Sequence, residues 1–476
     1  MKTLTQVEPR KDVSTLSGNS TAVYAITVAG SYYLTSNLNG AAGKDTIAVT
    51  VPGVTIDLNG FSLLSTDSSR SAILGIDILG DSGASLTVRN GRVVGGAYGV
   101  RGTTRLACYD LIVEGGSTQG VLGGSDSIIE RCRVSSAGML VGVRSKITDC
   151  TTTGASGISV GDDSLVTKCQ TTAGGITGTD NVQISHCNVN NAPAFGINVN
   201  DRSIIRYCNV TTTARAGIQV NSRCRVEHCS VTGATGSGPS GDGGFKAGSE
   251  SIFESCQVTG SGVPGFVSSS SCQFQNCIAK TNTGAGFSCG TQSRLTDCTA
   301  SGNSGLGIDA ADRSVITGCL ALANNAGGIY ATGLGAILDR CSAAANTGGA
   351  GLRVFAGTIR DCEARETLGG PGIRASSGSM VLRNTSNSNG VAATPQNGFL
   401  IEGGRGRVEG NHAYNNTGLG IQVTNTSSTN SVLVISNSAG SNDTGEFSLG
   451  TGNAVGPIIS PSSVSTNTIP TANFNL

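Results

Sequence analysis

The sequence has no tryptophan, few aromatic residues (4%) and few charged residues (13%), and its 31 basic and 31 acidic side chains cancel. The lack of net charge argues against nucleic acid or an anionic membrane as a partner. No stretch approaches 18 consecutive apolar residues, which excludes a transmembrane helix. No apolar pattern of helical period occurs either, so we expect almost no helix.

Residues 1–20 lack the apolar central region of a signal peptide. Two explanations are open. Either the protein is cytoplasmic, or the sequence begins after a signal peptide that has been removed.

The chain is rich in glycine, 71 of 476 residues, and a cysteine recurs about every 21 residues. An apolar residue usually stands three positions before this cysteine, and a small or β-branched residue stands two positions after it. A glycine-headed segment such as GINV (196–199) then follows. Thirteen cysteines are assigned to this column: Cys108, Cys132, Cys150, Cys169, Cys187, Cys208, Cys229, Cys256, Cys277, Cys298, Cys319, Cys341 and Cys362.

Each repeat therefore contains three short strands separated by bends. Three strands per turn of roughly 21 residues, with no helix between them, predict an all-β fold, a single-stranded parallel β-helix (solenoid) of about 18 coils. Equal positions stack in such a solenoid, so we interpret the cysteine as a small, inward, buried hydrophobe. Disulfides between some neighbouring thiols, or soft-metal binding by them, are the alternatives.

Two further columns support this register. A serine or cysteine stands five residues before the repeated cysteine: Ser127, Ser145, Ser164, Ser203, Cys224, Ser251, Cys272, Ser293 and Ser314. In the C-terminal coils an asparagine stands five residues after the column position, broken only by Thr367: Asn282, Asn303, Asn324, Asn346, Asn389, Asn416 and Asn442. Stacked asparagines can hydrogen-bond along the axis, which predicts an asparagine ladder. The cysteine column itself is predicted to change to asparagine at both ends: Asn59, Asn90, Asn384, Asn411 and Asn437.

The repeats divide the chain into three segments. Residues 1–50 break the period and are predicted to form an N-terminal cap with a strand pair, residues 51–442 the β-helix repeats, and residues 443–476 a C-terminal cap or tail. Caps are expected because the ends of a solenoid expose unpaired strand edges.

The segments GSYYLTSNLNG (30–40), VTIDLNGFSL (54–63) and the closing GNAVGPI and ANFNL resemble a group of bacterial secreted right-handed parallel β-helix repeat proteins. The resemblance covers nearly the whole chain, and the coil is similar to that of pectate lyases and related polysaccharide-active enzymes. It implies a right-handed β-helix and an extracytoplasmic location, secreted or at the cell surface, but little about activity, because fold analogy is a weak basis for function.

Polysaccharide lyases of the fold that this chain resembles use a calcium-binding carboxylate cluster and an arginine or lysine base on one sheet face. The outward column of the glycine-headed strands holds one carboxylate, Asp309, followed on adjacent coils by Tyr330, Arg353 and Arg374. Calcium prefers six or more oxygen ligands, so no lyase site is predicted. This column is a candidate sugar contact, with a solvated polar face as the alternative.

A second candidate patch lies at the bend before the cysteines. It combines titratable and aromatic side chains that could serve proton transfer: His186, Arg206, Tyr207, Glu227, His228 and Glu254. The alternative is a stripe of alternating charge that keeps an edge soluble. The aspartates at 162, 163, 180, 201 and 312 are interpreted as turn residues that precede a strand.

Only residues 233–244 and 386–398 expand the repeats, so the sequence shows few loops that could build a cleft. The leading prediction is a non-catalytic, secreted or surface-exposed rod that acts as a structural, adhesive or glycan-binding module, with no metal and no organic cofactor. The first alternative is a polysaccharide-active enzyme, lyase or hydrolase. The second is a subunit that self-associates end to end in an extracellular filament or spike. Polysaccharide or cell-surface glycan is the expected partner; nucleic acid and membrane insertion are not.

Overall fold

The computed structural model describes residues 10–75, 85–135, 137–236, 242–460 and 469–476. The chain divides into two compact units, Met1–Cys224 (unit 1) and Arg225–Leu476 (unit 2). Each unit is a parallel β-helix, as predicted. The described part of the chain contains only two short 3-10 turns, η1 (Val13–Thr15) and η2 (Ser428–Asn430), and no helix in it is long and apolar enough to cross a membrane.

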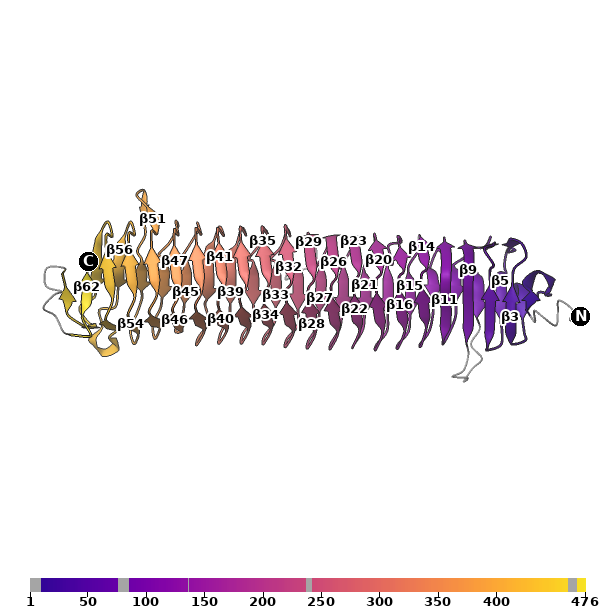
Figure 1. The fold of residues 1–476 in the computed structure, drawn as a ribbon, viewed down its shortest axis with the longest axis horizontal. Helices are drawn as coiled ribbons and strands as arrows, with labels where there is room; N and C mark the ends of the chain where they lie inside the picture. Colours follow the sequence, from indigo (N-terminus) through magenta and orange to yellow (C-terminus); the bar gives the residue numbers. More distant parts are fainter. Residues whose placement is uncertain (1–9, 76–84, 136, 237–241, 461–468) are drawn as a thin grey trace, which may run out of the picture. The chain divides into compact units, whose positions relative to one another are not determined.

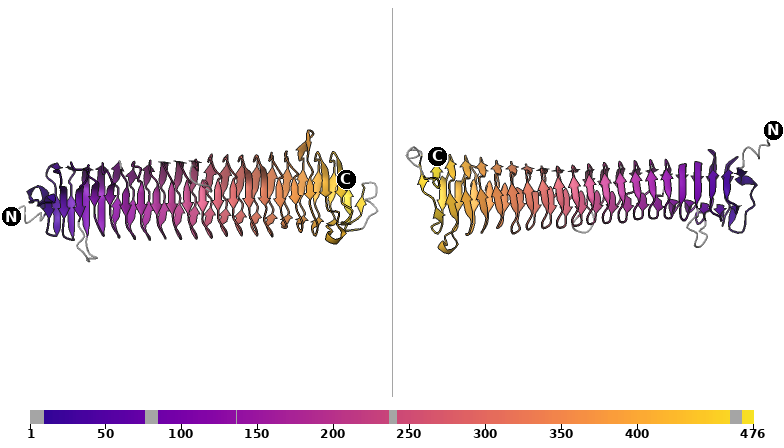
Figure 2. Two further views of the ribbon diagram at one scale, coloured as in Figure 1. Left: turned by 180° about the vertical axis from the view of Figure 1, so that it is seen from behind. Right: turned by 60° about the horizontal axis from the view of Figure 1, so that its bottom comes forward.

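Every coil has the same three-strand plan, which the coil of β24 (Ile197–Val199), β25 (Ile204–Arg206) and β26 (Asn209–Thr213) illustrates. Each strand pairs in parallel with its equivalent in the neighbouring coil; β24, for example, lies between β21 (Ile176–Gly178) and β27 (Ile218–Val220). Strands equivalent to β24 form sheet B, and strands equivalent to β25 and β26 form sheet A. Figures 1 and 2 show these stacks of neighbouring strands in each unit.

Within the described ranges each unit contributes ten sheet B strands. In unit 1 they are β2 (Ala22–Ile26), β5 (Asp45–Val49), β8 (Ser71–Gly75), β10 (Tyr98–Arg101), β12 (Gln119–Leu122), β15 (Met139–Val141), β18 (Ile158–Val160), β21, β24 and β27. In unit 2 they are β30 (Phe245–Ala247), β33 (Phe266–Ser268), β36 (Phe287–Cys289), β39 (Leu306–Ala310), β42 (Gly327–Ala331), β45 (Leu352–Val354), β48 (Ile373–Ala375), β53 (Phe399–Ile401), β56 (Leu419–Val423) and β59 (Gly445–Leu449).

The two sets of ten make twenty coils, slightly more than the predicted 18, because parallel pairing extends past both ends of the predicted repeats. The predicted strand pair near the N-terminus is instead one coil: β2 pairs with β5, and β3 (Gly30–Tyr33) pairs with β6 (Val54–Asp57). At the other end β59 still pairs with β56. Residues 1–9 and 461–468 of the predicted caps lie outside the described residues.

Two residues separate the two sheet A strands of a typical coil, and the first of them adopts the left-handed conformation. Asp149, Lys168, His186 and Tyr207 occupy this bend in successive coils, with φ of 52°, 54°, 55° and 53°. The bend sends the chain around the corner of the coil, and the following residue is the inward cysteine. This explains why a variable, outward bend residue is followed in most coils by a small inward one.

All sixteen cysteines are buried thiols, so the prediction of inward positions is confirmed. Neighbouring coils contact each other here: the Cys132 amide donates to Cys150 Sγ (3.4 Å), and the Cys150 thiol donates to the Ile129 carbonyl (3.6 Å). The assignment of Cys108 to the main column was wrong. Cys108 pairs with Ile129, and Leu111 takes the column position.

The assignment of Asn59 and Asn90 was also wrong, because both lie at the bend, with φ of 51° and 57°, where asparagine tolerates the left-handed conformation. Interval counting failed for Asn90 and Cys108 because β9 (Leu86–Val94) and β11 (Leu106–Glu114), which contain them, each run through the bend as one long strand. The asparagines at the C-terminal end do continue the cysteine column: the Cys362 amide donates to Asn384 Oδ1 (2.9 Å), and Asn384 Nδ2 donates to Asn411 Oδ1 (2.9 Å).

The predicted asparagine ladder is confirmed in unit 2. Asn303 donates from both its backbone N–H (3.1 Å) and its Nδ2 (2.9 Å) to Asn324 Oδ1, and Asn324 Nδ2 donates in turn to Asn346 Oδ1 (3.1 Å) and to the Ala300 carbonyl (3.0 Å). The three asparagines are fully buried. A buried amide is tolerated because each of its groups has a partner.

We expect Asn324→Ala to destabilise unit 2 by about 3 kcal/mol or more, because it leaves several buried donors and acceptors in adjacent coils without partners. Urea unfolding followed by circular dichroism measures this change. Asn325→Ala is the matched control, because Asn325 is exposed and should tolerate the change. A loss below 1 kcal/mol for Asn324→Ala would contradict a structural role for the ladder.

We also expect none of the sixteen thiols to react with an aromatic disulfide reagent in the native protein, and all of them to react after denaturation. Burial blocks access and raises the pKa of the Cys108 and Cys289 thiols. Thr153→Cys, at an exposed position, should add one thiol per chain that reacts rapidly in the native protein. Fast native reaction of several wild-type thiols would refute the interpretation of the cysteines as core residues.

Candidate functional site

The outer face of sheet B in unit 2 brings the first predicted set of residues together. Asp309 (β39), Tyr330 (β42), Arg353 (β45) and Arg374 (β48) are direct register partners from one strand to the next. Each strand buries the residues on either side of them, so the four side chains point outward and are half-buried. In Figure 1 these strands lie side by side within unit 2.

Tyr330 and Arg353 form the centre of this face. The Arg353 guanidinium lies over the Tyr330 ring, 5.6 Å from its centroid. The Ala350 amide donates to the Tyr330 hydroxyl oxygen (2.9 Å), and a Cβ added at Gly349 would lie 2.3 Å from that oxygen. The ring is therefore held close against a glycine backbone. Arg353 Nε is buried and has no hydrogen-bond partner in the described structure.

Arg374 has a carboxylate partner that sequence reasoning missed. Glu402 accepts two hydrogen bonds from the Arg374 guanidinium, at Nε (2.7 Å) and at Nη2 (3.0 Å), and this pairing raises the pKa of Arg374. The strand partner of Arg374 is Leu400, two residues before Glu402. Column counting therefore gave no signal for the pair.

Asp309 has a different environment from Glu402. Its side chain makes no hydrogen bond or ion pair with the described residues, and burial raises the pKa of its carboxyl group. Glu402 lies four coils further along, about 19 Å away at a strand spacing of about 4.8 Å. Paired glycosidase carboxylates stand roughly 5–9.5 Å apart. The face thus presents an aromatic ring and guanidinium groups, and Asp309 and Glu402 are too far apart to act as a glycosidase pair.

The rims of this face carry features that project beyond the strands. Residues 386–398, one of the two predicted expansions, include an antiparallel hairpin of β51 (Gly390–Val391) and β52 (Thr394–Pro395), which stands out from the other turns in Figure 1. Along the opposite rim Leu334 and Phe355 are exposed in the turns after β42 and β45. In the other expansion, 233–244, residues 237–241 lie outside the described residues.

The second predicted patch falls in both units. In unit 1 His186 and Tyr207 stack with ring centroids 5.0 Å apart and an interplanar angle of 23°. They border a cleft of about 220 Å³ together with Arg206 and four residues of β22 (Gln183–Ser185) and β25: Gln183, Ile184, Ser185 and Ile204. The structure therefore brings His186, Arg206 and Tyr207 together.

In unit 2 Glu227 and Glu254 both accept hydrogen bonds from Arg225, the bond to Glu254 measuring 2.9 Å. His228 lies at the bend of the same coil, with φ of 51°. These two carboxylates therefore serve an ion-pair network on sheet A of unit 2.

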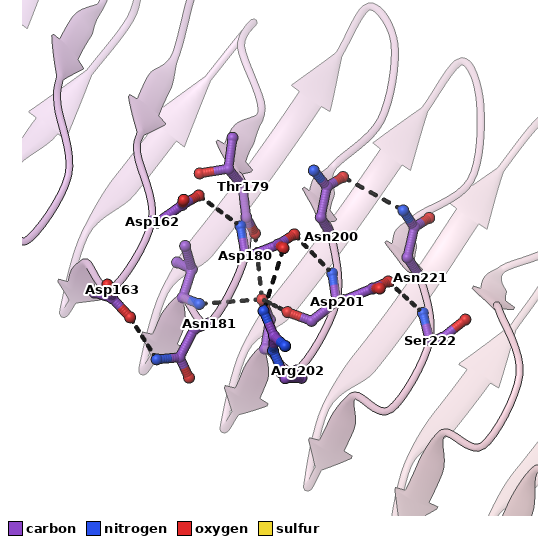
Figure 3. Close-up of polar contacts among 12 residues, drawn as sticks. Asp162, Asp163, Thr179, Asp180, Asn181, Asn200, Asp201, Arg202, Asn221 and Ser222 are labelled. Carbon is purple, nitrogen blue, oxygen red and sulfur yellow. Dashed lines mark hydrogen bonds and ion pairs between the residues drawn. The ribbon is translucent and has the colours of Figure 1, made fainter.

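The turn aspartates have the structural role that was predicted for them. Asp162 Oδ1 accepts from the Asp180 amide (3.0 Å), Asp180 Oδ1 from the Asp201 amide (3.3 Å), and Asp201 Oδ1 from the Ser222 amide (3.0 Å), as Figure 3 shows. Hydrogen bonds from the Thr179 side chain and from the Asp180 amide lower the pKa of Asp162. Among the described residues no three His, Cys, Asp or Glu side chains are placed to hold a metal ion.

The family model described as "Right handed beta helix region" matches residues 175–319 and 305–464. No curated protein sequence matches the chain. The Dettilon tailspike protein is 12% identical over 68% of this chain, with a TM-score of 0.33, and the match spans 62% of the tailspike. A double mutant of the periplasmic alginate epimerase AlgG is 10% identical over 78% of this chain; the match spans 77% of the epimerase, with a TM-score of 0.28. The A-module of the Azotobacter vinelandii mannuronan C-5 epimerase AlgE6 is 12% identical over 94% of this chain; the match spans 90% of the module, with a TM-score of 0.28.

We expect Asp309→Asn to raise the Tm of unit 2 at pH 7 and to leave it unchanged near pH 3. The pKa of Asp309 is raised in the folded state, so folding is opposed above that pKa, where the carboxylate must be buried with its charge. Below the pKa of the unfolded chain the carboxyl is neutral in both states. Calorimetry across this pH range measures the effect. The exposed Asp443, changed to Asn, is the control, and a gain that is equal at both pH values would refute the argument.

Proposed function

This chain belongs to the family of right-handed β-helix proteins, and we propose that it is a non-catalytic glycan-binding module that holds a polysaccharide on the outer face of sheet B in unit 2. The observation that carries the proposal is the Tyr330–Arg353 pair, an aromatic ring and a guanidinium stacked on adjacent coils of a half-buried face. We further propose that the module is secreted or surface-exposed.

A polysaccharide suits this face for three physical reasons. A sugar ring offers an apolar C–H face that packs on an aromatic side chain. Its hydroxyl oxygens accept hydrogen bonds from the N–H groups of the planar arginine guanidinium. Tyr330 is held against the Gly349 backbone and Arg374 by Glu402, so little side-chain freedom is lost on binding. Residues in register on adjacent coils form a line, which fits an extended chain better than a compact ligand.

The second candidate function is a polysaccharide-active enzyme, and Asp309 is the observation that favours it. Burial raises the pKa of the Asp309 carboxyl group, a feature that enzymes use in general acids, and Tyr330 lies on the adjacent strand. The distance of about 19 Å to Glu402 favours binding over hydrolysis by a carboxylate pair. End-to-end self-association into a filament or spike remains a third, separate proposal, to which neither of these residues contributes.

The test is affinity electrophoresis of the purified protein through gels that contain single acidic or neutral polysaccharides. We expect at least one polymer to retard the protein, and Tyr330→Ala and Arg353→Gln each to weaken that interaction by about tenfold or more, as for central interface residues. Tyr414→Ala is the control, because Tyr414 is an exposed tyrosine on sheet A of the same unit.

The same samples, assayed for new reducing ends and for absorbance of unsaturated products, separate the two candidates. Binding without cleavage supports the module. Cleavage that Asp309→Ala abolishes would replace it by the enzyme. Failure of every polysaccharide to retard the protein, or retardation that Tyr330→Ala leaves unchanged, would contradict binding at this face.

A further inference from the structure

The bend column of unit 1 changes its chemistry in two successive coils. The preceding bends carry Arg131, Asp149 and Lys168, side chains that extend into solvent, whereas the next two carry the aromatic residues His186 and Tyr207. All five adopt positive φ, which asparagine, aspartate and glycine tolerate best and a bulky side chain tolerates poorly. The left-handed backbone of the bend therefore gives no reason for a tyrosine at position 207. The same bend holds Arg131 and Lys168 in other coils, so its positive φ does not itself call for an aromatic ring.

The two rings are arranged as part of a surface site. They stack at a centroid distance of 5.0 Å, and 53% of Tyr207 remains exposed. The stacked pair therefore presents a partly exposed aromatic surface beside the cleft.

The cleft beside the rings combines apolar and hydrogen-bonding walls. Ile204 supplies apolar surface, while Gln183, Ser185 and Arg206 supply polar groups; Ile184 lines the cleft as a buried residue. The Ser185 hydroxyl is positioned by Thr167 of the preceding coil, with 3.0 Å between the two oxygens. No carboxylate lines the cleft. At about 220 Å³ it is smaller than the roughly 300–1,000 Å³ of clefts that enclose drug-sized ligands.

We propose that this cleft is a second, independent carbohydrate site, which takes a single pyranose ring at the end or on a side branch of a glycan. A pyranose has one apolar C–H face, which packs on the His186–Tyr207 rings, and an equator of hydroxyl groups, which reach Gln183, Ser185 and Arg206. The site lies on sheet A of unit 1, whereas the polysaccharide face proposed above lies on sheet B of unit 2. Each site can therefore be correct without the other.

The test uses methyl glycosides of glucose, galactose, mannose and N-acetylglucosamine as probes, with the full-length protein and saturation-transfer difference NMR. We expect one of them to bind with a Kd of about 1 mM, with the strongest transfer to its ring C–H protons. His186→Ala should weaken this binding at least fivefold. Tyr207→Phe should keep it, because the ring face remains.

Tyr207→Asn separates a binding role from a structural one. Asparagine suits the left-handed bend, so this variant is expected to keep or raise the Tm while it abolishes glycoside binding. Tyr414→Ala should leave glycoside binding unchanged. Absence of binding for all four glycosides at about 10 mM would overturn the proposal, and so would unchanged binding in Tyr207→Asn. Loss of glycoside binding in Tyr330→Ala would show that the ligand uses the sheet B face instead.

Discussion

The parallel hydrogen bonds between equivalent strands of successive coils are the constraint on which the rest of each unit depends. They hold one register, so that Ile197 lies beside Ile218 and Asn198 beside Gln219, at a strand spacing of about 4.8 Å. Every position of the repeat thereby becomes a column. Inward columns must be filled by similar side chains coil after coil, and outward columns bring chosen side chains into line.

The inward columns show two solutions to the same packing problem. A thiol is small and apolar enough to be buried without strong hydrogen bonds, so cysteine can repeat wherever space is limited. An asparagine amide is both donor and acceptor, and stacking lets each amide serve the next, as Asn303 and Asn324 do. Where Thr367 interrupts the run, Asn346 Nδ2 donates to the Ala321 carbonyl and the Thr367 amide donates to Asn389 Oδ1, so the amides on both sides keep partners.

The outward columns present the side chains of both proposed sites. Tyr330 lies against glycine backbone that a side chain at Gly349 would obstruct, and Tyr207 occupies a bend better suited to asparagine. A scaffold stabilised by many repeated contacts can tolerate such local departures. This separation of stable inward columns from variable outward ones allows one coil plan to present different surfaces.

The sequence alone determined the fold class, the inward cysteines, the members of the asparagine ladder and the alignment of Asp309, Tyr330, Arg353 and Arg374, because a period near 21 residues defines the register wherever the marker residues recur. The end coils and the place of Cys108 were decided only by the tertiary structure, since those coils lack the marker or continue one strand through the bend. The Arg374–Glu402 pair, the burial of Asp309 and the cleft beside His186 and Tyr207 depend on distances between side chains of different coils. Repeat spacing determines which residues are neighbours, but the directions of side chains and the space between them exist only once the coils are stacked.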